Sequence, residues 1–212
     1  MVIKMPYTLS PSKLNLMEDC PRCFWLSVVK KINRPSGPMA SIVIKIGSIT
    51  KKYFDKYRQK NELPPILKGK ISGTLPLDMP KTLVYSYNEN ITFVGRPDDY
   101  LQQTDGNIVP FDNKTRSKAP GGTHPAYQLQ LDSYSFLLEV NNYKTTDMAY
   151  LAYYYPNEGE LHKGMEISCH VVEVRTNSGR IKSLLNKAHR ILNGKIPNFG
   201  INCEFCKWKS AW

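Results

Sequence analysis

The chain has 212 residues and a formal net charge of +11, with thirteen tyrosines and three tryptophans. This length suits one domain with a substantial core and excludes two large ones, while the basic charge and the aromatic rings indicate an acidic partner, with nucleic acid as the leading candidate. Apolar runs fall short of the ~18 residues of a membrane span, and residues 1–6 lack a signal-peptide pattern, so we expect a cytoplasmic protein with no membrane partner.

The N-terminal part predicts a helix that carries two cysteines. Serine followed by proline at positions 10–11 is a good helix start, and Pro21 interrupts the helix between Cys20 and Cys23. A second C-x-x-C pair, Cys203 and Cys206, stands near the other end of the chain. Two such pairs without a secretory signal indicate a metal site rather than disulfides, and four thiolates suit either Zn²⁺ or a 4Fe-4S cluster. We expect the four cysteines to join the first helix to the C-terminal tail, an arrangement that we call the cysteine clasp.

The next stretch predicts a helix over residues 42–60, although residues 41–45 are equally compatible with a strand. Asp55 is the acid of this helix, and we expect it to be a solvated residue. Residues 60–80 contain several glycines and prolines and predict an irregular, basic segment on the surface. Residues 82–87 and 91–94 predict strands.

Residues 93–100 and 108–115 predict a β-hairpin around Asp105-Gly106. Alternation along the second strand puts Asp112 and Lys114 on one face. A two-residue turn sets Asp99 opposite Asp112, whereas a three-residue loop with Gly106 in the left-handed conformation sets Asp98 there. The residues themselves leave this choice open.

Asp98, Asp112 and Lys114 stand in otherwise apolar strands, where burial is costly unless the charges are paired or bind a metal ion. Two carboxylates and a lysine suit phosphodiester hydrolysis with Mg²⁺ or Mn²⁺, because the ion lowers the pKa of a bound water and the lysine orients that water or neutralises developing charge. The alternative is a surface hairpin with an ion pair between residues i and i+2.

The polar loop 115–123 follows, in which Arg116 and Lys118 are candidates for phosphate contacts or ordinary solvated residues. A helix over residues 127–139 comes next, and Gln130 and Tyr134 share one face of it because they are four residues apart. Residues 147–155 and 166–174 predict further strands, the second with a buried Cys169, and residues 177–192 predict a helix that ends at Gly194.

Three segments in this order, Gly95-Arg-Pro-Asp98, Asp112-Asn-Lys114 and Gln130-Leu-Asp-Ser-Tyr134, resemble the successive motifs of the PD-(D/E)XK nuclease superfamily in its RecB-like branch. The resemblance runs from Ser10 to the C-terminal cysteines and is closest to CRISPR-adaptation nucleases and helicase-nuclease domains with a cysteine cluster. It implies that Asp98 and Asp112 hold the metal ion and that Lys114 orients or activates water. It also implies that Gln130 and Tyr134 position the substrate and the lysine, and it supports the three-residue loop.

The chain departs from that family in two places. Relatives place a histidine or an acid on the first long helix as a further metal ligand, whereas Gly47, Ser48, Thr50 and Lys51 occupy the region here. Relatives with an iron-sulfur cluster commonly contribute one N-terminal and three C-terminal cysteines, whereas this chain has two and two. The resemblance favours 4Fe-4S, and the spacing leaves structural Zn²⁺ as the alternative.

We therefore expect one α/β domain over residues 1–212, restriction-endonuclease-like, with a mixed central sheet around the hairpin and flanking helices. The expected function is a metal-dependent DNA nuclease, plausibly an exonuclease on single-stranded or end-containing DNA. The alternative is a nucleic-acid-binding module that keeps the nuclease fold without activity. Expected partners are DNA and other proteins of a DNA repair or CRISPR adaptation system.

Overall fold

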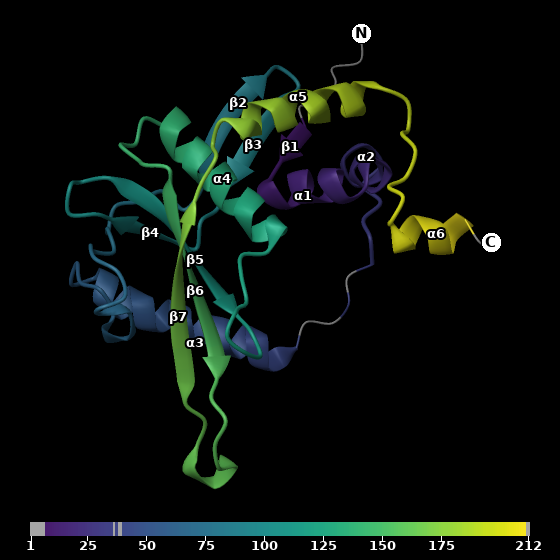
Figure 1. The fold of residues 1–212 in the computed structure, drawn as a ribbon. Helices are drawn as coiled ribbons and strands as arrows, with labels where there is room; N and C mark the ends of the chain where they lie inside the picture. The colour runs from purple at the N-terminus through teal and green to yellow at the C-terminus, as the bar shows by residue number, and fades with distance from the viewer. Residues whose placement is uncertain (1–6, 36, 38–39, 211–212) are drawn as a thin grey trace.

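The computed structural model describes residues 7–35, 37 and 40–210, which form a mixture of helices and strands (Figure 1). The helices are α1 (Pro11–Asp19), α2 (Pro21–Val29), α3 (Ser41–Arg58), α4 (Pro125–Val140), α5 (Arg180–Asn193) and α6 (Glu204–Ser210), with 3-10 turns η1 (Pro65–Leu67) and η2 (Leu161–Lys163). The strands are β1 (Tyr7–Leu9), β2 (Leu83–Asn88), β3 (Ile91–Gly95), β4 (Asp99–Gln102), β5 (Ile108–Thr115), β6 (Met148–Pro156) and β7 (Ile167–Arg175).

The larger sheet has four strands in the order β4-β5-β6-β7. The pairs β4–β5 and β6–β7 are antiparallel, whereas β5 and β6 are parallel and are joined through α4. Phe54 of α3 packs with Val109 and Phe111 on one face of β5, and α4 covers the other face with Leu131 and Tyr134 against Leu151 of β6. The sheet is therefore a middle layer between two helices, and alternate residues of β5 point toward α3 and α4.

The smaller sheet has three strands in the order β1-β3-β2, with β1 parallel and β2 antiparallel to β3. It forms the main hydrophobic core with α1, α2, α4 and α5. The predicted mixed α/β fold is confirmed, but the described residues form two mixed sheets where we expected one.

The division between the sheets falls inside the predicted first strand of the hairpin, so that prediction is wrong for residues 96–98. β3 ends at Gly95 in the smaller sheet and β4 begins at Asp99 in the larger sheet. Proline has no backbone N–H to give to a strand ladder, and Pro97 stands in the middle of the break. The link between the sheets therefore carries Asp98.

The register of the hairpin is now fixed. Asp99 pairs with Phe111 and Gln102 with Ile108, so the next position places Asp98 opposite Asp112. Gly106 has a φ of +83°, as a three-residue loop requires. The three-residue alternative is the correct one.

Most of the remaining element predictions are confirmed, with shifted ends. The first helix breaks at Cys20 into α1 and α2, and α3 is helical from Ser41, so the strand alternative there is wrong. Residues 1–6 and part of the predicted loop 33–38 lie outside the described residues. Within the described ranges, none of the helices has the length and apolar character needed to span a membrane.

Candidate active site and metal centre

Two carboxylates face each other where the two sheets meet. Asp112 of β5 is fully buried, and Asp98 lies opposite it in the link before β4. Asp98 accepts a hydrogen bond from the backbone N–H of Asn113, at 3.2 Å. Burial raises the pKa of Asp112 to about 7, with a further contribution from the charge of Asp98, while Lys114 acts in the opposite direction. A pair of this kind favours a bound cation or a bound proton.

Lys114 is held beside this pair from three sides. Its Nζ lies 2.5 Å from Oδ2 of Asp112 and donates a hydrogen bond of 3.0 Å to Oε1 of Gln130. The ring of Tyr127 lies beneath the same nitrogen, with the ring centroid 4.8 Å away. Strand alternation puts Asp112 and Lys114 on one face, and α4 supplies the other contacts.

Gln130 and Tyr134 of α4 connect the lysine to the link between the sheets. Gln130 Nε2 donates to Tyr134 Oη at 2.8 Å and to Asp112 Oδ1 at 3.3 Å. The Tyr134 hydroxyl donates to the carbonyl oxygen of Arg96, at 3.0 Å. A Cβ at Gly95 would lie 2.4 Å from a methyl carbon of Leu137, so only glycine permits α4 to pack this closely. The helix therefore fixes the segment that presents Asp98.

Asp99 points to the opposite face of the sheet. It is buried and forms an ion pair with Arg58 of α3, which also pairs with Asp55. Burial raises the pKa of Asp99 to about 6, and Arg58 opposes the shift. Asp55, expected to be solvated, keeps a partly exposed side chain in this pair. Of the two adjacent aspartates, Asp98 is the one that faces Asp112.

Sequence reasoning missed two tyrosines beside Lys114. Tyr127 precedes Gln130 by three residues, and Tyr153 of β6 pairs directly with Lys114 across the parallel strands. The Tyr153 hydroxyl is buried, and none of the described residues gives it a hydrogen bond. Burial raises the pKa of Tyr153, and Tyr127 adds to that shift. Alternation along β6 fixes the face of Tyr153, but its neighbour follows only from the β5–β6 register.

Three other polar side chains near the site, Arg116, Lys118 and His124, are peripheral. Arg116 and Lys118 are exposed in the loop after β5. The ring of His124 caps α4 by accepting the backbone N–H of Ala126, at 3.1 Å. In the described part of the chain, the four cysteines are the sole group of three or more histidine, cysteine or acidic side chains close enough to share a metal ion. The active-site pair thus offers two carboxylates.

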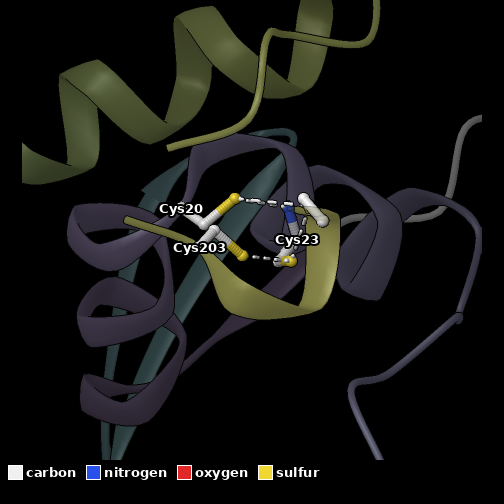
Figure 2. A group of neighbouring side chains, drawn as sticks. Cys20, Cys23 and Cys203 are labelled. Atoms are coloured by element: carbon white, nitrogen blue, oxygen red, sulfur yellow. Dashed lines mark hydrogen bonds between the residues drawn. The ribbon is translucent and has the colours of Figure 1, made fainter. Parts of the chain in front are cut away.

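The four cysteines of the two C-x-x-C pairs form a separate centre between α2 and α6. Figure 2 shows three of them, Cys20, Cys23 and Cys203. All four sulfurs lie within 4.8 Å of one another, and three of the separations are 3.5, 3.6 and 3.9 Å. Sulfurs bound tetrahedrally about 2.3 Å from one Zn²⁺ are about 3.8 Å apart. The sulfurs are therefore spaced for one tetrahedral ion, while four thiolates on separate irons of a 4Fe-4S cluster require wider spacing.

Hydrogen-bond donors surround these sulfurs. Gly200 N–H donates to Cys20 Sγ at 3.3 Å, and the Arg34 guanidinium donates to Cys203 Sγ at 3.2 Å. Burial opposes ionisation of Cys20, but the N–H groups of Gly200 and Cys23 and the neighbouring thiols bring its pKa down to about 6. Burial and the adjacent sulfurs raise the pKa of Cys206. Such crowded thiols ionise together only around a cation, so the donor set fits a metal ion.

A family model and two solved structures are similar to this chain. A family model described as the PD-(D/E)XK nuclease superfamily matches residues 51–211. The crystal structure of SSO0001 is similar over 97% of this chain and 85% of that chain, with a TM-score of 0.50 and 16% identity. The crystal structure of LHK-Exo in complex with dAMP is similar over 96% of this chain and 93% of that chain, with a TM-score of 0.42 and 12% identity. Among curated proteins no match is found.

Proposed function

Because the chain belongs to the PD-(D/E)XK nuclease superfamily, we propose that it is a divalent-metal-dependent nuclease that hydrolyses DNA, acting on single strands or strand ends. The observation that carries the proposal is the placement of Asp98 opposite Asp112 with Lys114 at 2.5 Å from the Asp112 carboxylate. These three side chains are the ones that metal-assisted phosphodiester hydrolysis needs.

The carboxylates fit a divalent ion. Asp112 is buried beside a second carboxylate, and the two disfavour each other's charge, which an ion between them would reverse. Asp98 and Asp112 would hold Mg²⁺ or Mn²⁺ through hard oxygen ligands. When bound, the ion supplies a water of lowered pKa and stabilises charge on the phosphate.

The surrounding side chains would act on the water and the phosphate. Lys114 donates toward the water or toward the developing negative charge. Gln130 holds the lysine through its Oε1 and the acidic pair through its Nε2. Tyr134 keeps Asp98 in register, because its hydroxyl is bonded to the carbonyl of Arg96. A preorganised arrangement of this kind lowers the barrier without reorganisation during the reaction.

The proposed branch of the superfamily and the proposed partners rest on the order of the motifs along the chain. Gly95, Asp98, the Asp112–Lys114 segment and the Gln130–Tyr134 pair follow the RecB-like pattern. The cysteines stand near the two ends of the chain, as in CRISPR-adaptation and helicase-nuclease relatives, but are divided two and two rather than one and three. We propose that residues 1–212 act as one nuclease unit whose partners are DNA and other proteins of a repair or adaptation system. We further propose that the cysteines hold a structural metal centre, as 4Fe-4S on family grounds or as Zn²⁺ on the sulfur spacing.

The test is degradation of labelled single-stranded DNA, duplex DNA and RNA with Mg²⁺, Mn²⁺ or EDTA. We expect metal-dependent loss of single-stranded or end-containing DNA, abolished in Asp112→Ala and reduced mainly in turnover in Lys114→Ala. Asp78→Ala, at an exposed acid, serves as the matched control.

Two other results have a clear meaning. Wild-type activity in Asp112→Ala would refute the site assignment. Binding of DNA without cleavage under every metal condition would identify a binding module with a nuclease fold. This outcome is a real alternative because the described residues supply only two carboxylates to hold a metal ion at the site.

A further inference from the structure

A pocket of about 570 Å³ opens beside the cysteine centre, away from the acidic pair. Its walls include the apolar side chains Ile32, Ile196, Phe199, Phe205 and Trp208, and we call it the aromatic pocket. All five are exposed, and Trp208 keeps 72% of its surface accessible. Grouped exposed apolar side chains of this kind mark a binding site.

The pocket has a fixed wall. The Arg34 guanidinium lies 5.1 Å from the centroid of the Phe205 ring. The same guanidinium is held by Asp19 at 2.5 Å and by Cys203 Sγ at 3.2 Å. Because Arg34 is tied to two other elements, the ring of Phe205 is positioned before any ligand arrives, and little order has to be gained on binding.

The charge of the pocket selects its ligand. Both charged residues among those that line it, Arg22 and Arg34, are arginines. Arg34 is already paired with Asp19, whereas Arg22 and the exposed Lys30 and Lys31, on the segment after α2, supply the positive charge for an anionic ligand. Aromatic rings with adjacent cations bind single-stranded nucleic acid, because bases stack on the rings and phosphates pair with the cations.

One helix, α1, contacts both the helix of the candidate active site and the cysteine centre beside the pocket. Asn15 in the middle of α1 donates to the carbonyl oxygen of Ala126, in the first turn of the helix that carries Tyr127 and Gln130. α1 then ends at Cys20, in the centre beside the pocket. In Figure 1, α1 accordingly lies between α4 and α2.

We propose that the aromatic pocket binds a base of the single strand whose phosphate occupies the candidate active site. The inference rests on the proposed function, because the strand in the pocket is the nuclease substrate. It predicts that affinity depends on strand length, since a short oligonucleotide reaches one site and a longer one reaches both.

The experiment measures anisotropy of labelled oligothymidylates of about 4 to about 16 nucleotides in EDTA, where cleavage does not interfere. Wild-type affinity should rise with length. Trp208→Ala should bind the long strands roughly tenfold more weakly and the short ones unchanged, as loss of one stacked base predicts. Trp208→Phe should keep most of the increase in affinity with strand length. Ile201→Ala, at an exposed residue of the same tail that does not line the pocket, should match wild type.

Quenching of indole fluorescence by the long strand, lost in Trp208→Ala, provides a second measurement on the same proteins. Equal affinities of wild type and Trp208→Ala at all lengths, or a wild-type affinity independent of length, would overturn the proposal. Cleavage of the short strand with Mn²⁺ is scored separately: protein that shows the length effect but never cleaves refutes the nuclease function alone, and protein that cleaves without the length effect refutes the pocket alone.

Discussion

At the scale of single residues, the acidic pair links metal binding to pH. Burial raises the pKa of Asp112 from 3.8 to about 7, so below that pH Asp112 of the metal-free protein carries a proton that a metal ion at the proposed site would displace. The same shift makes stability depend on pH. Between pH 3.8 and about 7, Asp112 binds a proton in the folded protein more often than in the unfolded chain, so its contribution to the free energy of unfolding falls as pH rises.

We predict that Mn²⁺ affinity falls about tenfold per pH unit below pH 7 and levels off above it, because one proton is released per ion bound. Titration calorimetry in buffers of different ionisation enthalpy measures both the affinity and the released proton. Asp112→Asn, the isosteric control, should lose most of the binding. Affinity that stays constant from pH 6 to pH 8 would show that no proton is displaced from Asp112 in this range, and unchanged affinity in Asp112→Asn would show that Asp112 is not a ligand.

The ring of Tyr127 gives a second prediction at this scale. When a metal ion takes the Asp112 carboxylate, Lys114 loses its anionic partner and keeps Gln130 and the ring. A cation over an aromatic face gains roughly 0.5–2 kcal/mol. Tyr127→Leu should therefore lower kcat by about three- to thirtyfold with KM little changed, and Tyr127→Phe, which keeps the ring, should restore it. A similar loss in both variants would mean that the hydroxyl rather than the ring matters.

Much of this site could be predicted from residue order, and part of it could not. The positions of Asp112, Lys114, Gln130 and Tyr134 relative to one another follow from strand alternation and from helical spacing, both of which are local. Tyr153 reaches Lys114 only because β5 and β6 pair in parallel in one register, and no local pattern encodes that register.

At the scale of elements, an ion pair between Arg58 and Asp99 adds to the apolar packing of α3 on the larger sheet. Arg58 is mostly buried and neutralises the buried Asp99. Removing one partner of such a pair leaves an uncompensated charge. We predict that Arg58→Met lowers the free energy of unfolding by roughly 2–4 kcal/mol in urea titrations at neutral pH.

The control for that prediction is Arg175→Met. Arg175 pairs with Asp147 at 2.9 Å but keeps 84% of its side chain exposed, so its loss should cost less than about 1 kcal/mol. If both substitutions cost the same, the pair between α3 and Asp99 contributes no more than a surface contact.

The helices and strands could be predicted where neighbouring residues in the sequence specify them. Serine and proline before α1, and apolar spacing along α4 and α5, specify these helices. The separation of β3 from β4 was missed, because residues 93–100 read as one apolar strand and the effect of Pro97 depends on a second sheet being available for the chain to join. Partner choice among strands is a long-range property.

At the scale of the whole molecule, the cysteine centre joins segments 180 residues apart. A metal that binds only the folded chain stabilises it, and the long closed loop restricts the unfolded chain. We predict that chelation or Cys203→Ser lowers the melting temperature by several degrees or more. Metal analysis of anaerobically purified protein identifies the centre, as brown protein with about four irons or colourless protein with about one zinc.

Cys169 supplies the control for the cysteine prediction, since it is buried in the sheet far from the centre and Cys169→Ala should leave the metal content unchanged. Protein that contains neither metal, and whose melting temperature does not respond to Cys203→Ser, would rule out a metal clasp.

The position of the cysteines along the chain also sets the order in which the protein is completed during synthesis. Cys20 and Cys23 leave the ribosome first, and their partners emerge some 180 residues later, after every strand of both sheets. Domains generally fold as synthesis proceeds, from the N-terminal side. The cysteine centre therefore closes only after the strands of both sheets have been synthesised. A chain released before Cys203 lacks half of the four cysteines, and we expect it to be more open to proteolysis.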